Sequence, residues 1–170
     1  MARAHRLRYY GASILRSPCR EVDPDEPGLG DLVSDMRRVM RRHDGVGLAA
    51  PQVGRDLRLV LVWPPERREE SPTVMLNPVI ETVSEDDVPF LEGCLSFPGI
   101  YRTVDRPGSV EVSYQQPGGR RVRRRCDGLE ARIVLHEVDH LDGKLLVDHL
   151  SGWRRRDVQL RMIWRRIFPW

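Results

Sequence analysis

Two histidines stand four residues apart in the segment HEVDH, residues 136–140. Residues at this spacing differ by about 40° in direction on an α-helix, so both imidazoles can reach one metal ion when the segment is helical. Glu137 then lies one step round the helix, near enough to contact a water molecule at the ion without binding the ion itself. The motif therefore requires a helix here and a fold that brings further ligands to one face of it.

Three segments have the apolar spacing of helices. The first covers residues 29–43, and the second covers residues 129–141 and contains the two histidines. The third follows Ser151, which is a suitable N-cap, and its apolar residues share a face while arginines fill the others. These apolar residues are Trp153, Leu160, Trp164 and Ile167.

Strand-like segments separate these helices. Residues 57–63 and 73–83 are predicted strands, the second interrupted at Asn77-Pro78, with a polar, proline-bounded loop between them. Residues 109–114 and 121–126 flank QQPGGR, the sequence of a loose hairpin turn. A chain of 170 residues is long enough for one core and short for two domains. We therefore expect one α+β domain over residues 1–170, with short, mostly antiparallel strands around a central HExxH helix.

Positive charge is concentrated at the C-terminal end. Residues 151–170 contain six arginines and one aspartate, a charge of +5 within a net charge of +3, which leaves −2 for residues 1–150. A basic C-terminal helix on a nearly neutral body suggests an acidic partner, with nucleic acid before a membrane surface, although a solvated cationic face explains the same charges. The sequence contains no run of about 18 apolar residues that could span a membrane. Three cysteines without paired spacing fit a reducing compartment.

A catalytic metal site of this kind needs a third protein ligand and an open position for water. In an extended HExxHxxGxxH motif that ligand would be residue 146, but Leu146 stands there, and no glutamate follows Glu137. A downstream aspartate stays open but has no supporting motif. Cys94, in the segment EGCLS at residues 92–96, is the best candidate, because a thiolate suits a borderline-soft divalent ion and the glycine permits a close backbone approach.

A glycine-rich turn, GVGLAAPQ at residues 45–52, follows the first predicted helix. Such a turn offers a backbone strip to a peptide, and the amide of Gln52 is able to donate a hydrogen bond to a developing oxyanion. Together with EGCLS and HEVDHLDG, in this order, the turn resembles the motif set of the peptide deformylase family: GxGLAAxQ, EGCLS and HExDHLxG. The resemblance runs from about Tyr10 to Leu150.

The resemblance implies a peptide-deformylase-like fold and a hydrolase that removes the N-formyl group from formyl-methionine at the N-terminus of nascent polypeptides, releasing formate. It implies one divalent metal ion, Fe²⁺ physiologically, with Zn²⁺, Ni²⁺ or Co²⁺ as other occupants in the isolated protein. The implied ligands are Cys94, His136 and His140, with water in the fourth position.

The resemblance also implies the remaining catalytic and substrate-binding residues. Glu137 would be the general base, and the Gln52 amide and the Leu95 backbone N–H would hold the oxyanion. The substrate backbone would lie, strand-like, along Gly45 to Gly47 and the segment after Cys94. The pocket for the methionine side chain would be formed by Val46, Leu129 and Ile133, although ordinary core packing explains these three apolar residues equally well.

For partners and location, we expect an N-formylmethionyl peptide as substrate, a cytoplasmic monomer and no membrane contact. Because the resemblance begins near residue 10, we expect no cleaved targeting segment. The charge of the C-terminal segment adds the hypothesis that it docks weakly on ribosomal RNA.

Two other functions stay open on the sequence. A metal-dependent peptidase would use the same HExxH motif on internal amide bonds, although Leu146 and the missing downstream glutamate count against it. A non-catalytic ribosome- or nucleic-acid-binding module with a structural metal would use the arginine-rich C-terminal segment, but no fourth protein ligand is evident to close its metal site.

Overall fold

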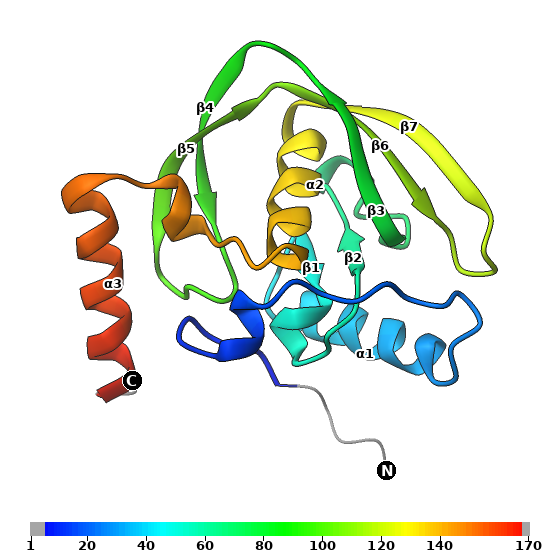
Figure 1. Ribbon diagram of the computed structural model, residues 1–170, viewed down its shortest axis with the longest axis horizontal. Coiled ribbons are helices and arrows are strands. Elements are labelled where there is room, and N and C mark those ends of the chain that lie inside the picture. Colours follow the sequence, from blue (N-terminus) through cyan, green and yellow to red (C-terminus); the bar gives the residue numbers. More distant parts are fainter. Residues whose placement is uncertain (1–5, 168–170) are drawn as a thin grey trace.

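A computed structural model describes residues 6–167 (Figure 1). The helices are α1 (Leu29–Arg42), α2 (Gly128–Leu141) and α3 (Gly152–Ile167). The strands are β1 (Gly47–Ala49), β2 (Leu59–Val62), β3 (Thr73–Val83), β4 (Asp87–Gly93), β5 (Tyr101–Pro107), β6 (Ser109–Gln115) and β7 (Arg121–Asp127). Short 3-10 helices are η1 (Ser13–Arg16), η2 (Ala50–Val53), η3 (Pro65–Arg67) and η4 (Leu146–His149). The α+β prediction and all three helices are confirmed.

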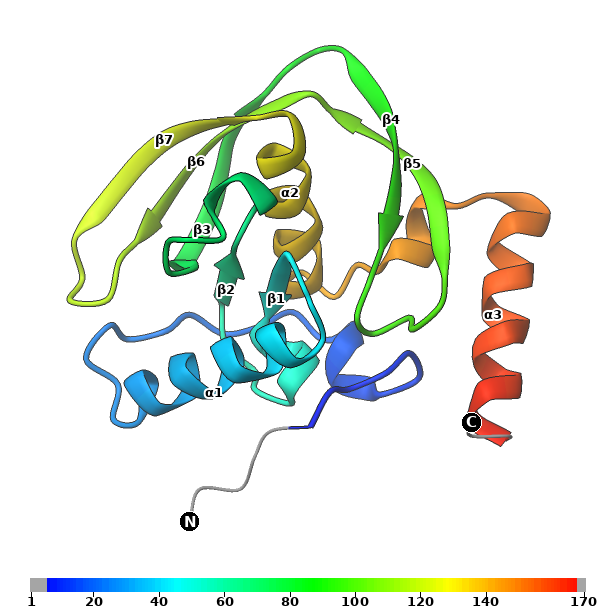
Figure 2. The ribbon, with the colours of Figure 1, turned by 180° about the vertical axis from the view of Figure 1, so that it is seen from behind.

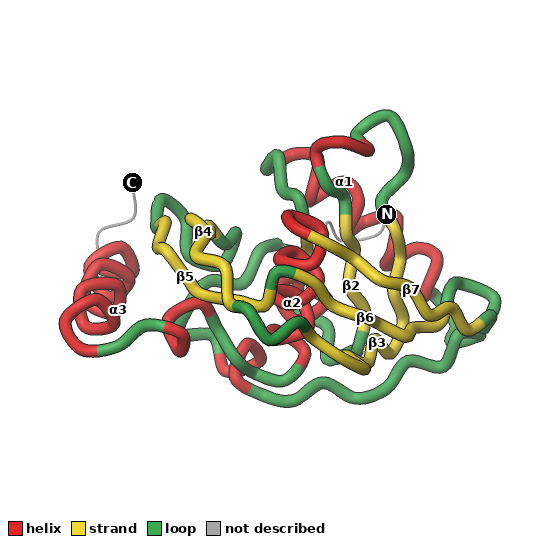
Figure 3. Tube along the Cα trace, turned by 90° about the horizontal axis from the view of Figure 1, so that it is seen from above, coloured by secondary structure: helices red, strands yellow, loops and turns green. Residues whose placement is uncertain are grey.

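The strands form two antiparallel sheets. One has five strands in the order β1-β2-β3-β6-β7, and the other is the β4–β5 hairpin. The helix α2 lies between them, as two perpendicular views show (Figures 1 and 3). The fold therefore encloses α2 between a broad sheet and a narrow one.

The two faces of the large sheet are covered by different helices. In β2, Leu59 and Leu61 join the core cluster that contains the buried side of α1, whereas Val60 and Val62 join the cluster that contains α2. All four side chains are buried, which explains why β2 is a continuous apolar run instead of an alternating one. The view from behind shows α1 on the side of the large sheet opposite to α2 (Figure 2).

The interruption expected at Asn77-Pro78 is a β-bulge within one continuous strand. Asn77 has a φ of 50°, and the register of β3 against β6 shifts between Leu76 and Val79. The Asn77 side chain compensates for the irregular backbone, because its amide donates to the Val22 carbonyl at 2.8 Å and its oxygen accepts from the Val22 N–H at 2.8 Å. The strand therefore bends at this point without ending.

The helix α3 packs through residues other than those whose spacing first indicated it. Trp153, Leu160 and Trp164 share a face, but that face is exposed, with Trp153 73% accessible. The helix instead contacts the core through Val158 and Met162, which join a cluster with η1 and η4. The side chain of Ile167 lies outside the described residues. Within residues 6–167, no helix is long and apolar enough to cross a membrane.

Candidate active site

The helix α2 brings the HEVDH motif into the interior. Its apolar side chains Ala131, Val134 and Val138 pack in the cluster beneath the large sheet, so the opposite side of the helix faces the β4–β5 hairpin. The rings of His136 and His140 have centroids 5.2 Å apart, and both residues are buried. The two imidazoles thus face the same space, as the helical spacing predicted.

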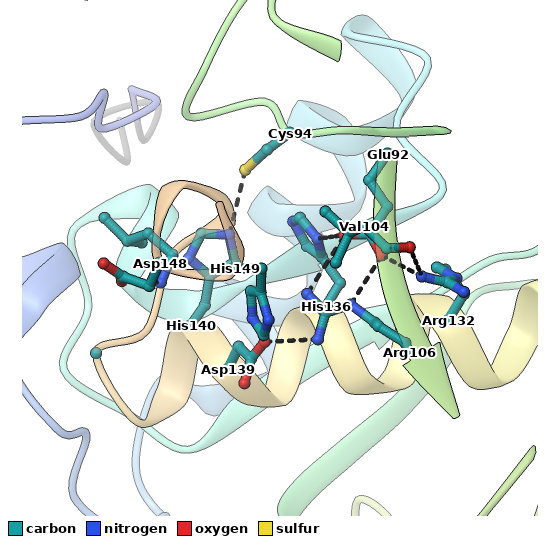
Figure 4. Close-up of polar contacts among 12 residues, drawn as sticks. Glu92, Cys94, Val104, Arg106, Arg132, His136, Asp139, His140, Asp148 and His149 are labelled. Atoms are coloured by element: carbon teal, nitrogen blue, oxygen red, sulfur yellow. Dashed lines mark hydrogen bonds and ion pairs between the residues drawn. The ribbon is translucent and has the colours of Figure 1, made fainter. Parts of the chain in front are cut away.

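Cys94 reaches this space from the end of β4. Its Sγ lies 3.2 Å from His140 Nε2, and the nearest ligand atoms of Cys94, His136 and His140 all lie within 4.8 Å of one another. Figure 4 shows the sulfur directed at the His140 ring. One thiolate and two imidazoles suit a divalent transition metal and leave a position open for solvent.

The charges at this cluster favour a cation. Burial raises the pKa of the Cys94 thiol, but His140 and His136 outweigh burial and lower it to about 5, so the thiolate forms at neutral pH. Burial lowers the pKa of His136, yet Cys94 and Glu92 raise it well above its ordinary value. Negative groups therefore surround the imidazole and favour positive charge beside it. The three side chains fit a metal ion on both geometry and charge.

Glu92 orients the first histidine and is a site residue that the sequence analysis missed. Its Oε2 lies 2.9 Å from His136 Nδ1, which leaves Nε2 of that ring to face the sulfur. Two buried arginines hold the carboxylate, with Arg106 Nε at 2.7 Å and Arg132 Nη1 at 2.9 Å from Oε1. Burial opposes ionisation, but His136 and Arg106 lower the Glu92 pKa to about 2. Glu92 could have been recognised as a site residue because it begins the EGCLS motif. Arg106 and Arg132 lie in none of the three motifs, so no sequence pattern indicated them.

Asp139 extends this network toward the surface. Its Oδ2 accepts a hydrogen bond from Arg106 Nη1 at 2.6 Å and lies 2.7 Å from His149 Nε2. His149 therefore supports the aspartate within the motif and lies outside the three-residue ligand cluster.

Gln52 is held in a fixed orientation beside the cluster. The Ala49 N–H donates to its Oε1 at 2.8 Å, while its Nε2 donates to Ser96 Oγ at 3.2 Å and lies 3.6 Å from Cys94 Sγ. The amide donor thus points toward the thiolate. Leu95 follows Cys94 directly, in the turn after β4, and is half-buried. Its backbone N–H therefore lies next to Cys94 in the chain.

Glu137 is buried at the edge of the cavity. Its Oε2 has no hydrogen-bond partner among the described residues, and burial raises its pKa to about 7. The backbone of the glycine-rich segment, residues 45–52, passes close to α2. A Cβ added at Gly47 would lie 2.4 Å from Glu137 Oε1 and 2.8 Å from Ile133 Cγ2. Glycine at position 47 therefore lets the backbone strip pass beside this carboxylate.

A cavity of about 410 Å³ opens beside these groups. Its wall includes the residues that were expected to contact substrate: Val46, Gly47, Leu129 and Ile133. It also contains residues of the β4–β5 hairpin and its surroundings that the sequence did not indicate: Phe90, Leu91, Tyr101 and Arg132. The structure brings the predicted catalytic and pocket residues together around one cavity with Cys94 and His136, and His140 lies behind its wall, in contact with Cys94.

Comparison with known proteins identifies related chains. A sequence model of polypeptide deformylases matches residues 4–156. A peptide deformylase from Picosynechococcus is 39% identical over 147 residues, covering 86% of this chain and 79% of that protein. One from Treponema pallidum is 41% identical over 155 residues, covering 91% and 93%.

Solved structures agree with the sequence matches. A peptide deformylase from Legionella pneumophila superposes with a TM-score of 0.89 at 34% identity, covering 97% of each chain. One from Synechococcus elongatus, in complex with actinonin, superposes with a TM-score of 0.86 at 38% identity, covering 95% of this chain and 88% of that one.

Proposed function

Because this chain belongs to the peptide deformylase family, we infer that it is a hydrolase that removes the N-formyl group from formyl-methionine at the N-terminus of nascent polypeptides and releases formate. The observation that carries this inference is the juxtaposition of a thiolate and two imidazoles with a buried carboxylate at one cavity. The cavity, lined in part by Val46, Leu129 and Ile133, offers room for an apolar side chain beside these groups.

We propose Cys94, His136 and His140 as ligands of one divalent ion, with Fe²⁺ as the physiological occupant. The bound ion would supply Lewis acidity, which polarises a carbonyl group and lowers the pKa of a water molecule. The thiolate and imidazole donors also accept Zn²⁺, Ni²⁺ or Co²⁺, so the occupant of the isolated protein depends on metal supply. The low thiol pKa and the carboxylate on His136 support a cation here.

Glu137 is proposed as the general base. With a pKa of about 7, its carboxylate accepts a proton from the attacking water near neutral pH and then passes that proton to the departing amine. Burial is what brings this pKa into the useful range, because an exposed glutamate titrates near 4.3 and is a weaker base.

Gln52 and the Leu95 N–H are proposed to stabilise the oxyanion that forms when the formyl carbon is attacked. The Ala49 N–H fixes the Gln52 oxygen, so the amide nitrogen faces the cluster without needing to reorient during the reaction. Preorganised donors of this kind are each worth about 10²- to 10³-fold in rate.

Val46, Leu129 and Ile133 are proposed as walls of the methionine pocket, with the substrate backbone along Gly47. All four residues contact the cavity, and the backbone at Gly47 passes close beside Glu137. This close approach favours a small acyl group next to the carboxylate, which fits a formyl group better than the bulkier acyl carbon of an internal peptide bond.

The decisive experiment is anaerobic purification with elemental analysis, followed by a formate assay on a formylmethionyl peptide. We expect about one divalent ion per chain, formate release and no cleavage of the same peptide lacking the formyl group. Cleavage of internal amide bonds without formate would favour the peptidase alternative. Absence of both reactions in the metal-loaded protein would favour the non-catalytic binding module.

We also propose that α3 docks weakly on ribosomal RNA, which would place the enzyme near emerging substrate, and that the protein acts as a cytoplasmic monomer. Arg154 and Arg156 are exposed on α3, which projects from the body away from the large sheet (Figure 1). Counterion release makes such contacts sensitive to salt.

To test this docking, Arg154 and Arg156 are replaced by glutamine, and a control carries the same change at Arg120 and Arg121 on the β6–β7 turn. The α3 variant should bind ribosomes more weakly, with a salt slope reduced by about 1 to 2, while the control binds as the wild type does. Equal binding by both variants would leave the arginines as a solvated face. Light scattering after gel filtration tests the monomer.

A further inference from the structure

The β4–β5 hairpin supplies the thiolate, and its strand β4 is largely exposed. It is a two-stranded sheet, and Val88, Phe90 and Leu91 of β4 are between 42% and 59% exposed. An isolated two-stranded sheet is marginally stable at best. Because Cys94 follows β4 directly whereas the histidines are on α2, the geometry of the cluster depends on what joins the hairpin to the helix.

Arg132 makes the connection from α2 that reaches both strands, one turn before His136. Its Nη1 donates to Glu92 Oε1 at 2.9 Å and to the Val104 carbonyl at 2.9 Å, and its Nη2 donates to the Val88 carbonyl. The guanidinium carbon also lies 5.6 Å from the centre of the Phe90 ring. One side chain therefore contacts β4 at three residues and β5 at one.

The connection is buried and electrically balanced. The Arg132 side chain is 7% exposed and the Glu92 side chain is 4% exposed. Arg106 joins the same carboxylate to Asp139, so two arginines face two carboxylates. Arg106 makes only side-chain contacts in this network, whereas Arg132 also bonds to the backbone of both strands.

We propose that Arg132 is a positioning residue, which holds Cys94 at metal-binding distance from His136 and His140 by fastening both strands of the hairpin to α2. The inference rests on the proposed metal site. Val88 and Glu92 lie six and two residues before Cys94, so a hairpin released from Arg132 carries the thiolate away from the imidazoles. The expected result is faster loss of the ion and altered contact between the sulfur and the ion.

The test uses full-length protein loaded with Co²⁺, whose thiolate-to-metal absorption band reports directly on the sulfur ligand. Arg132→Met removes the positive charge and the hydrogen bonds of the guanidinium group but keeps a long, unbranched side chain. Arg124→Met is the control, because Arg124 bonds Glu130 in the first turn of the same helix from β7, a strand of the large sheet and not of the hairpin. The band and the rate of cobalt transfer to a chelator are measured for each protein.

We expect Arg132→Met to lose cobalt about 10- to 100-fold faster than wild type, with a weakened thiolate band, while Arg124→Met matches wild type in both. Absence of the band in wild-type protein would refute the proposed thiolate ligand and this inference together. A normal wild-type band that Arg132→Met reproduces, with an unchanged transfer rate, would leave the metal site standing and overturn the role of Arg132.

Arg132→Lys covers the case in which the methionine variant does not fold. Lysine keeps the charge but lacks the planar fork that reaches both strands. Urea unfolding is measured with and without Co²⁺. A larger loss of stability in the cobalt-loaded protein supports the positioning role, and equal losses in the two states would reduce Arg132 to a structural residue.

Discussion

The helices α2 and α3 are similar in length, at 14 and 16 residues, but their surroundings differ. α2 lies between two sheets and buries polar side chains along with apolar ones, including His136, Glu137 and His140. α3 lies at the edge of the molecule and buries Val158 and Met162, while Trp153 and Trp164 are exposed (Figure 1). A helix enclosed on several sides can hold charged groups in fixed positions, whereas the polar contacts of a peripheral helix are open to solvent and add little to its apolar contacts.

The same contrast appears in two carboxylates that each lie between two arginines. Glu92 pairs with Arg106 and Arg132, and its side chain is 4% exposed. Asp157 of α3 pairs with two arginines on the surface, and its side chain is 29% exposed. Water screens the second group and not the first. The difference indicates that enclosure, more than the number of charged partners, decides what a carboxylate contributes.

The largest effect is expected from Glu137→Gln on α2. Loss of the proposed base should lower kcat by about 10²- to 10⁴-fold, because glutamine cannot transfer the proton. Elemental analysis should find unchanged metal content. The control is Glu130→Gln on the same helix, which pairs with Arg67 and Arg124 and should leave kcat unchanged. Equal turnover by wild type and Glu137→Gln would rule out the proposed base.

The second effect concerns stability inside the enclosed region. Glu92→Gln removes the charge that balances Arg106 and Arg132, and breaking a buried pair in this way costs about 3 to 5 kcal/mol. Urea unfolding of the metal-free protein measures this loss independently of the ion. A change below about 1 kcal/mol, the range of exposed pairs, would contradict the claim that enclosure matters.

The third prediction tests how α3 is held. Met162 is 5% exposed, so Met162→Ala should lower the free energy of unfolding by about 2 kcal/mol, at the low end for such changes because an edge helix can relax. Leu160→Ala on the solvent face should change it by less than about 0.5 kcal/mol. Equal losses at the two positions would show that the helix packs differently in solution.

The fourth prediction concerns acid. Asp148 of η4 pairs with Arg16 and lies 3.5 Å from Arg155 of α3. Burial raises its pKa, but Arg16 and the Leu145 N–H outweigh burial and lower the pKa below the ordinary value of an aspartate. In the unfolded chain an aspartate titrates near a pKa of about 3.9. Because the folded-state pKa is lower, the charged carboxylate stabilises the fold above that pH, and this stability is lost as the pH falls through the folded-state pKa.

Asp148→Asn should therefore be less stable than wild type at pH 7, and the difference should shrink as the pH falls through the lowered folded-state pKa of Asp148. Urea unfolding at several pH values gives the comparison. A difference that stays constant with pH would show that Asp148 acts through packing and not through its charge.

The smallest effect is expected from Asp157→Asn. Although Asp157 pairs with Arg102 and Arg161, solvent screens these contacts, and the urea midpoint should not change measurably. A shift comparable to that of Glu92→Gln would erase the distinction between the enclosed and the peripheral helix.

Most of the proposed active site was predictable because its signals are local. The spacing of His136 and His140 requires a helix and a shared face, and three short motifs identify Cys94, Gln52 and Glu137 as candidates from the sequence alone. The structure places all of them except His140 in the wall of one cavity, and His140 contacts Cys94 from behind that wall. Their proximity could be expected from the resemblance, but not from the spacing of residues so far apart in sequence.

The β4–β5 hairpin was not predictable in the same way. β4 has no alternation of buried and exposed side chains, since most of its residues are exposed, and alternation is the signal that identifies a half-buried strand. The location of the bend at Asn77-Pro78 was predicted, whereas its form as a bulge depended on the Val22 backbone that pairs with Asn77.

The sequence by itself determined the three helices, four of the five strands of the large sheet and the side chains that can bind an ion or move a proton, because periodicity and motif spacing act over a few residues. Tertiary structure decided which face of α3 is buried, how Arg106 and Arg132 pair with Glu92, and how far burial raises the Glu137 pKa. Those outcomes depend on contacts between segments distant in the chain and on exclusion of water, which no local pattern encodes.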